Sequence, residues 1–167
     1  MAKHRLRVNL FDPQSLSDAV RRLEEVRDNI LRNSTDLLNQ LADIGAQNAR
    51  NMVVAYDAIE TGTLYNSIYP VGATEGERIS KVVADTPYAV YVEYGTGIVG
   101  SANRHPEPDG WDYDANDHGD AGWWYYDWAY SNWRWTKGQP AKPFMYETKL
   151  YLERLAPKVA ANLYKKL

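Results

Sequence analysis

SLSDAVRRLEEVRDNILRNSTDLLNQLADIGAQNARNMVVAY, residues 15–56, contains one glycine and no proline. Its apolar residues recur every three or four positions, as on one face of an α-helix: Leu16, Val20, Leu23, Val26, Ile30, Leu37, Leu41 and Ile44. The pattern predicts a long N-terminal helix, with start signals at Asp12, Pro13, Ser15 and Ser17. Because the stretch exceeds the usual helix length, we expect it to project beyond its own core and to break or bend near Asn33. Residues 33–36 either cap a second helix or lie on the solvent face of one long helix.

The segments that follow predict an α+β fold with a small antiparallel sheet. β-branched residues at 67–71 and 78–84 flank a glycine-containing loop at 72–76, which is typical of a hairpin. Residues 88–94 predict a short central helix that presents one face made of Tyr88, Tyr91 and Val92. Its expected boundaries are Pro87 in the first turn, and Gly95 and Gly97 at the end.

A proline-containing turn at 138–143 leads into a predicted final helix, about 144–167. Its apolar positions share one face: Leu152, Leu155, Val159 and Leu163. We expect Pro157 to kink this helix.

GWWYYDWAYSNWRW, residues 122–135, holds five of the chain's 6 tryptophans. The aromatic content predicts two strands, at 123–128 and 133–136, joined by a short loop. Side chains alternate along a strand, so Trp123, Tyr125 and Asp127 should face one side, and Trp124, Tyr126 and Trp128 the other. One face is expected to pack on the domain and the other to meet a partner. The same rings also suit a carbohydrate platform, a base-stacking surface or simple internal packing, whereas the adjoining acidic loop disfavours membrane insertion.

The composition indicates one soluble domain spanning residues 1–167. The chain is 44% hydrophobic and 25% charged, and no apolar run is long enough to cross a membrane. No secretory signal is recognised at the N-terminus, so we expect a protein made in a cytoplasm. The absence of cysteine excludes disulfides and thiol catalysis, and a net charge of -3 argues against a general nucleic-acid binder.

Residues that could carry chemistry are few. Asp112, Asp114 and Asn116 copy the first three ligand positions of an EF-hand loop, but Asp117 stands at its glycine position and Trp123 at its glutamate position. A calcium site of another geometry and a solvated acidic loop both remain alternatives. The chain contains no HExxH, GxSxG or phosphate-loop pattern.

The two histidines beside acidic residues, His105 and His118, are interpreted as solvated loop residues. We therefore predict no enzyme activity, no cofactor and no metal. A metal-dependent hydrolase built from Asp112, Asp114, His105 and His118 is the enzymatic alternative.

Three stretches carry a family resemblance: TGTLYNSI at 61–68, TPYAVYVEYGTG at 86–97 and GQPAKPFMYET at 138–148. In this order, behind a long N-terminal helix, they resemble the small tail-component family of tailed bacteriophages. These are described as head-tail joining, neck or tail-completion proteins of long-tailed phages. Residues 98–137, the acidic loop and tryptophan run, exceed the shortest family versions and read as an insert.

The resemblance implies an α+β subunit of a six-copy ring that joins or completes the tail and lets genomic DNA pass without sequence-specific binding. It implies neck and tail neighbours, namely a connector or stopper above and a terminator or tail tube below, and a place in the virion after assembly in the bacterial cytoplasm. A tail terminator ring is the alternative within the family, and a glycan-binding module the alternative outside it. The expected subunit or partner contacts are Tyr88, Tyr91, Glu93, Tyr94, Gly95, Thr96, Trp124, Tyr126, Trp128, Trp133, Trp135, Pro140 and Phe144.

Overall fold

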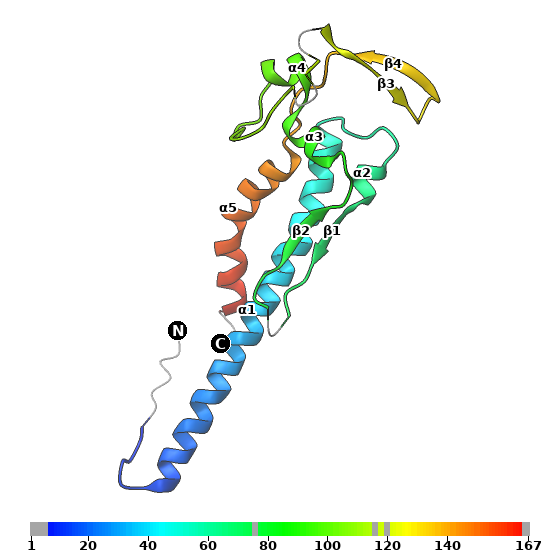
Figure 1. Ribbon diagram of the computed structural model, residues 1–167. Coiled ribbons are helices and arrows are strands. Elements are labelled where there is room, and N and C mark those ends of the chain that lie inside the picture. Colours follow the sequence, from blue (N-terminus) through cyan, green and yellow to red (C-terminus); the bar gives the residue numbers. More distant parts are fainter. Residues whose placement is uncertain (1–6, 75–76, 115–116, 119–120, 165–167) are drawn as a thin grey trace.

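The computed structural model describes residues 7–74, 77–114, 117–118 and 121–164. Its elements in chain order are α1 (Pro13–Ala55), α2 (Thr63–Asn66), β1 (Ile68–Val71), β2 (Lys81–Ala84), α3 (Ala89–Tyr94), α4 (Gly97–Ala102), β3 (Trp123–Asp127), β4 (Asn132–Thr136) and α5 (Phe144–Tyr164). Figure 1 shows an elongated chain in which α5 and the β1–β2 hairpin flank the C-terminal half of α1. The predicted α+β fold is confirmed. Residues 75–76 of the predicted hairpin loop and residues 165–167 of the predicted final helix lie outside the described residues.

Helix α1 is continuous, and the predicted break near Asn33 is wrong. Asp12 caps its start, because the Asp12 side chain accepts a hydrogen bond from the Gln14 amide at 3.1 Å. The hydroxyl of Ser34 donates to the Ile30 carbonyl at 2.8 Å, and that of Thr35 to the Leu31 carbonyl at 3.2 Å. The polar cluster therefore bonds back to the preceding turn instead of capping a second helix.

The core lies along the C-terminal half of α1. Small residues on this half allow the β1–β2 hairpin and α5 to approach closely: a Cβ atom at Gly45 would lie 2.8 Å from Val82 and 2.9 Å from Leu152. The main buried cluster consists of Ala46, Ala49, Val53, Leu64, Ile68, Ala89, Val92 and Phe144. Along α5, the predicted apolar face is half-buried, and the helix runs on through Pro157.

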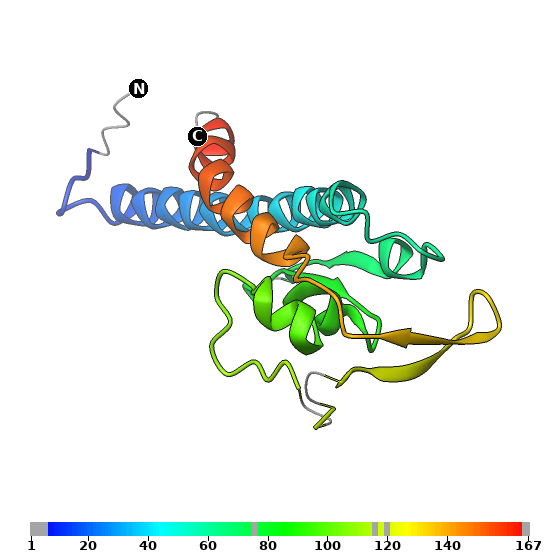
Figure 2. The same ribbon diagram turned by 90° about the horizontal axis from the view of Figure 1, so that it is seen from above.

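The two small sheets are antiparallel hairpins. In the first, Ile68 pairs with Ala84 and Val71 with Lys81, so β2 starts later than the predicted 78–84. In the second, Trp123 pairs with Thr136 and Asp127 with Asn132. Figure 2 shows the β3–β4 hairpin extending away from α1 and α5, which confirms the predicted tryptophan hairpin as a separate element.

The region around α3 differs from the prediction in three ways. Pro87 lies before the helix, whose N-cap is Tyr88. The three residues predicted to share one face differ in burial, since Val92 is buried while Tyr88 and Tyr91 are exposed. Gly97, with a positive φ of 61° that favours glycine, opens the unpredicted helix α4 instead of ending α3.

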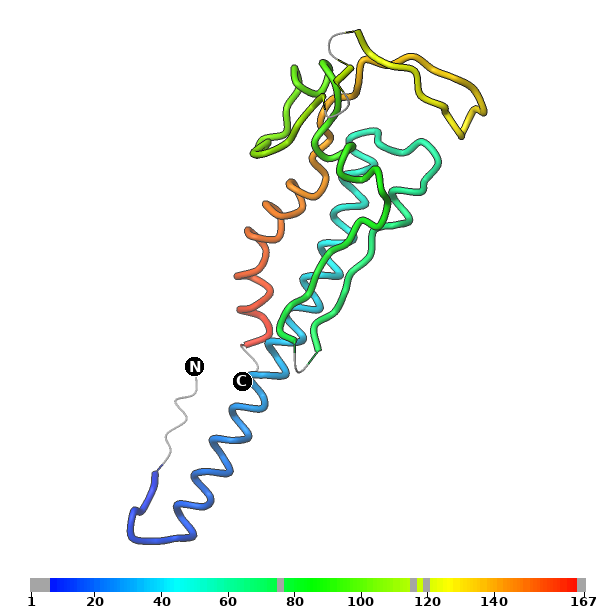
Figure 3. The backbone as a smooth tube through the Cα atoms, in the orientation of Figure 1, coloured from blue at the N-terminus to red at the C-terminus, as the bar shows by residue number. Residues whose placement is uncertain are grey.

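Beyond α5, the first part of α1 stands alone. The last described residue of α5, Tyr164, bonds through its hydroxyl to that of Ser34 at 2.8 Å. Residues 13–33, here called the arm, continue past this point with no other described helix or strand beside them (Figure 3). Leu16, Val20, Leu23, Val26 and Ile30 of the arm are between 40% and 60% exposed. The predicted projecting apolar helix is thus present.

Tyr164→Phe should lower the free energy of unfolding by about 1 kcal/mol, since it deletes the hydroxyl that ties the end of α5 to α1. Thermal denaturation would show a midpoint about 2–4 °C lower. Tyr151→Phe on exposed α5 surface is the control and should leave the midpoint unchanged. Equal shifts in both variants would contradict a specific role for the Tyr164 hydroxyl.

A search of the described helices finds none that is long and apolar enough to span a membrane.

Candidate functional site

Two of the motif stretches, distant in sequence, lie side by side. The Thr96 amide donates to the Gln139 carbonyl at 2.9 Å, and the Gln139 amide donates back to Thr96 at 3.1 Å. Nearby, the Lys142 amide donates to the Val92 carbonyl at 2.9 Å. The end of α3 and the turn into α5 therefore form one structural unit.

A buried carboxylate, Glu93, organises this unit. One of its oxygens accepts from the Met145 amide and the other from the Tyr146 amide, both at 2.9 Å, so Glu93 caps the N-terminus of α5. The Oε1 atom also lies 3.2 Å from Nε2 of His105. Glu93 thus joins α3, α5 and the loop after α4.

His105 is 4% exposed, so its interpretation as a solvated loop residue is wrong. Its Nδ1 lies 3.0 Å from the Glu107 amide nitrogen, and its ring contacts Tyr94 and Tyr146 at centroid distances of 4.4 and 5.2 Å. Both ring nitrogens are engaged. No sequence pattern indicated this role, because the loop containing His105 gives no sign that it folds back onto α3.

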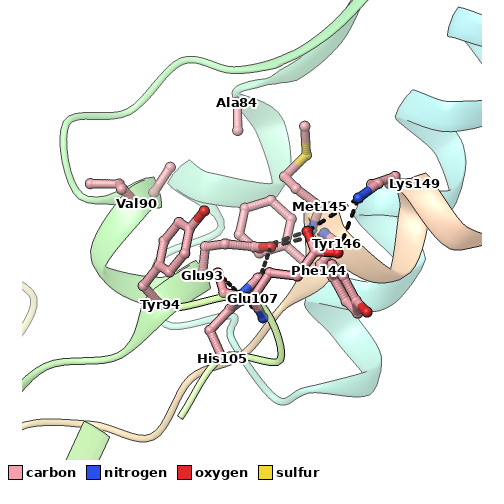
Figure 4. Close-up of a pocket in the computed structure, with 11 residues that line it drawn as sticks. Ala84, Val90, Glu93, Tyr94, His105, Glu107, Phe144, Met145, Tyr146 and Lys149 are labelled. Atoms are coloured by element: carbon pink, nitrogen blue, oxygen red, sulfur yellow. Dashed lines mark hydrogen bonds and ion pairs between the residues drawn. The ribbon is translucent and has the colours of Figure 1, made fainter. Parts of the chain in front are cut away.

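A cavity of about 410 Å³ opens beside Glu93 and His105 (Figure 4). Its apolar walls come from Ala84, Ala89, Val90, Phe144 and Met145. At its exposed edge, Lys149 and Glu107 form an ion pair at 3.1 Å, and the hydrogen bond that Lys149 donates to Glu107 raises the pKa of Lys149. The cavity therefore has apolar walls and a charged rim.

Burial removes three of the expected contact residues from the surface. Glu93, Gly95 and Phe144 are buried within the chain, where they shape the α3–α5 unit. Tyr94 and Thr96 are half-buried, and the Tyr94 ring stacks on Trp111 with centroids 5.0 Å apart. The remaining motif residues stay exposed: Tyr88, Tyr91 and Pro140.

The β3–β4 hairpin presents one face made almost wholly of aromatic rings. Cross-strand pairs place Trp124 opposite Trp135 and Tyr126 opposite Trp133, with ring centroids 5.4 and 5.6 Å apart. Trp128 contacts Tyr126 at 4.6 Å. We call these five residues the aromatic face. Its tryptophans are between 49% and 84% exposed, which is unusual for so many large rings in one patch.

The opposite face of the hairpin packs on the domain less than predicted. Tyr125 is exposed, and Trp123 is half-buried against His118 with ring centroids 5.0 Å apart. Only Asp127 is buried there, and its partners belong to the hairpin itself. The Asp127 carboxylate accepts from Arg134 at 2.8 Å and from the Ala129 amide at 3.0 Å, which closes the hairpin loop.

Acid should loosen this loop. The hydrogen bond from Arg134 lowers the pKa of Asp127, burial opposes that shift, and the Tyr130 and Ala129 amides reinforce it. A carboxyl with a lowered folded pKa stabilises the fold above its unfolded pKa, near 4, and that contribution is lost as the pH falls below it. We expect tryptophan fluorescence to change between pH 5 and 2 in the native chain.

Asp127→Asn is the matched variant, because it keeps the shape and removes the titration. The tryptophan fluorescence of this variant should lose the part of its pH dependence that comes from Asp127. Identical fluorescence titrations of the two proteins would contradict the assignment.

In the acidic loop around residues 112–118, aspartate side chains accept hydrogen bonds from backbone amides of the same loop. Asp112 accepts from the Asp114 amide at 3.0 Å, and Asp114 accepts from the His118 amide at 2.8 Å. These three residues line a cavity of about 50 Å³ next to Trp123, whereas His105 lines the larger one, so the residues of the hydrolase alternative are divided between two places. Asn116 lies outside the described residues. Among the residues that the structure describes, no group of three or more acidic or histidine side chains could hold a metal ion.

No family model, curated protein or solved structure matches the chain in these comparisons.

Proposed function

We propose that this chain is a structural subunit of the neck or tail of a tailed bacteriophage. In this proposal it forms a ring that joins or completes the tail at the head-tail interface and lets DNA pass. The observation that carries the proposal is a pair of exposed apolar surfaces at opposite ends of one elongated chain: the arm and the aromatic face (Figure 1). The ordered motifs at 61–68, 86–97 and 138–148 supply the phage context.

Two different surfaces at opposite ends favour head-to-tail association. In such a heterologous contact, each subunit uses one surface toward one neighbour and the other surface toward the next, and a closed series of these contacts is a ring. The arm alone is roughly 30 Å long at 1.5 Å per residue, so it is long enough to lie across an adjacent subunit. A soluble monomer would gain nothing from leaving both surfaces in water.

The charge of the chain suits a conduit for DNA. A net charge of -3 is compatible with lining a conduit for DNA, because a basic lumen would hold phosphates that must slide through. We propose six copies around the channel, with a connector or stopper above and a terminator or tail tube below, in a virion assembled in the host cytoplasm. A tail terminator ring is the alternative position for the same architecture.

Deleting the gene from its phage or prophage tests the proposal. Negative-stain electron microscopy of the lysate should show filled heads beside separate tails, or heads without functional tails. Re-supplying the protein from a plasmid should restore joined particles. Normal, infectious particles from the deletion would overturn the proposed role.

The exposed aromatic face also supports a second candidate, a glycan-binding module. Flat indole surfaces can stack on sugar rings, and this face offers four tryptophans to solvent. Soluble sugars or cell-wall fragments would then quench the tryptophan fluorescence in a saturable way, and Trp124→Ala would weaken that response. A flat titration with the native chain would dismiss this candidate.

A further inference from the structure

The exposed apolar stripe of the arm has the same pattern when read from either end. Its members follow one another at spacings of four, three, three and four positions: Leu16, Val20, Leu23, Val26 and Ile30. The residue types share this symmetry, because a valine stands on each side of Leu23 and a leucine or isoleucine stands at each end. A second copy of the arm laid antiparallel would therefore match the stripe residue by residue. Leu23 would meet Leu23, and Leu16 would meet Ile30.

The charges around Leu23 have the opposite symmetry. Two arginines, Arg21 and Arg22, come directly before Leu23, and two glutamates, Glu24 and Glu25, come directly after it. An antiparallel pair of arms centred on Leu23 would bring the arginines of each copy level with the glutamates of the other. A parallel pair would align arginine with arginine and glutamate with glutamate, and such like-charge contacts are unfavourable. The charges therefore favour the antiparallel direction.

Arg22 and Glu25 are the charges best placed to meet across this pair. They are three positions apart and lie on one flank of the helix, and two-fold symmetry sets that flank beside the same flank of the other copy. Among the residues that the structure describes, Arg22 has no ion-pair partner, and Glu25 has only Arg21, at 4.0 Å. Further out, Asp18 would be level with Asp28, but each already pairs with an arginine of its own chain, at 3.4 and 2.9 Å.

The stripe continues a face of α1 that already packs against a helix. Ile30 and Ser34 are four positions apart and so share one face, and the Ser34 hydroxyl bonds to that of Tyr164 at the end of α5, at 2.8 Å. Helix α5 runs antiparallel to α1 (Figure 1). An antiparallel arm from a second copy would therefore continue the line of α5 along α1. Centring on Leu23 sets residue 13 of one copy level with residue 33 of the other, so the two arms would overlap over their whole length.

We propose that two copies of the free chain pair through their arms, antiparallel and centred on Leu23. The contact is isologous, because both copies use the same surface, so it closes with two copies and leaves both aromatic faces outside it. It goes beyond the proposed function, whose ring contacts are head-to-tail. The pair covers the arm of a chain that has not yet joined a ring, and ring assembly through the arm requires the pair to separate.

Disulfide trapping tests the pairing and its direction, because the native chain has no cysteine. Leu16→Cys and Ile30→Cys are prepared with tags of different size and oxidised mildly, both separately and mixed. The expected product is a mixed disulfide with little of either self-disulfide, because the two Leu16 positions of a pair lie about 21 Å apart along the arms. Self-disulfides of Leu16→Cys without the mixed product would show a parallel contact and overturn the inference.

A single cysteine at the centre of the stripe gives the matched comparison. Leu23→Cys should cross-link with itself, because the two Leu23 positions meet at the two-fold axis. Val54→Cys is the control, since Val54 is 53% exposed on the same helix but lies outside the arm. Equal trapping of Leu23→Cys and Val54→Cys, or no trapping at any arm position, would overturn the inference.

Charge reversal gives a second readout by analytical ultracentrifugation. Arg22→Glu and Glu25→Arg change exposed side chains, and each alone should weaken dimerisation about threefold or more, since it sets like charges together at two symmetric places. Mixed in equal amounts, the two variants should recover the dimerisation of the native chain, because each supplies the charge that the other lacks. Native dimerisation in each variant alone would contradict the proposed register.

Gene deletion separates this inference from the proposed function. A native chain that stays monomeric at every concentration, from a gene whose deletion still leaves heads and tails apart, would overturn the arm pairing alone. Cross-linked arms in a chain whose deletion leaves normal, infectious particles would support the arm pairing and overturn the proposed function alone.

Discussion

Replacing Trp124 and Trp128 together by alanine should abolish ring assembly while leaving the subunit folded. The two rings are 60% and 84% exposed in the subunit, so removing them costs the monomer little. At an interface, truncation of a buried tryptophan typically costs about 2 kcal/mol or more. Two such losses would total about 4 kcal/mol, or roughly a thousandfold in the association constant.

Analytical ultracentrifugation of the purified protein and plating of phage that carry the double variant would measure this effect. Tyr130→Ala is the matched control: Tyr130 is 65% exposed in the loop of the same hairpin and contacts Arg134, which lies outside the aromatic face. We expect the control to keep both assembly and phage yield. Intact assembly in the tryptophan variant would show that the aromatic face is not an interface.

The second large effect should come from Glu93→Ala, and it should act on folding. The substitution leaves the Met145 and Tyr146 amides and the His105 ring without their common acceptor. Loss of one partner from a buried polar cluster of this kind costs about 3 kcal/mol, because the others stay buried and unpaired. Chemical denaturation should show a lower midpoint, with the thermal midpoint down by about 10 °C.

Glu107→Gln is the control for Glu93→Ala. Its ion pair with Lys149 is exposed to water, with both side chains more than half accessible, so its loss should cost less than 1 kcal/mol. A Glu93→Ala protein as stable as the control would contradict the assignment of Glu93 as the cap of α5. A loosened α3–α5 unit would also deform the adjacent cavity, which Glu93 lines.

Local sequence signals were enough for the elements with strong periodicity. The helix face from Leu16 to Ile44 and the alternating rings of the tryptophan run each indicate their own structure, because the pattern and the conformation involve the same few neighbouring residues. The break expected near Asn33 was wrong for a related reason. Ser34 and Thr35 can either cap a helix or bond back to it, and only the surrounding turns decide which.

The candidate site was harder to predict because its contacts join distant segments. Glu93 was expected at a subunit or partner contact, and its carboxylate accepts hydrogen bonds at the start of α5, about fifty positions later in the chain. His105 follows the same logic, since its burial depends on Tyr94 and Tyr146 closing around it. Residues that act through long-range packing leave no periodic trace in the sequence.

One helix serves both as the spine of the core and as the projecting arm, so self-association through the arm would be linked to folding. When the core opens, the arm loses its rigid support. The stability of any contact made by the arm would therefore depend on the free energy that closes the core. By mass action, partners that bind only the closed subunit raise its apparent stability as concentration increases. A newly made chain would then be least stable while alone and would gain resistance to proteolysis as soon as neighbours engage it.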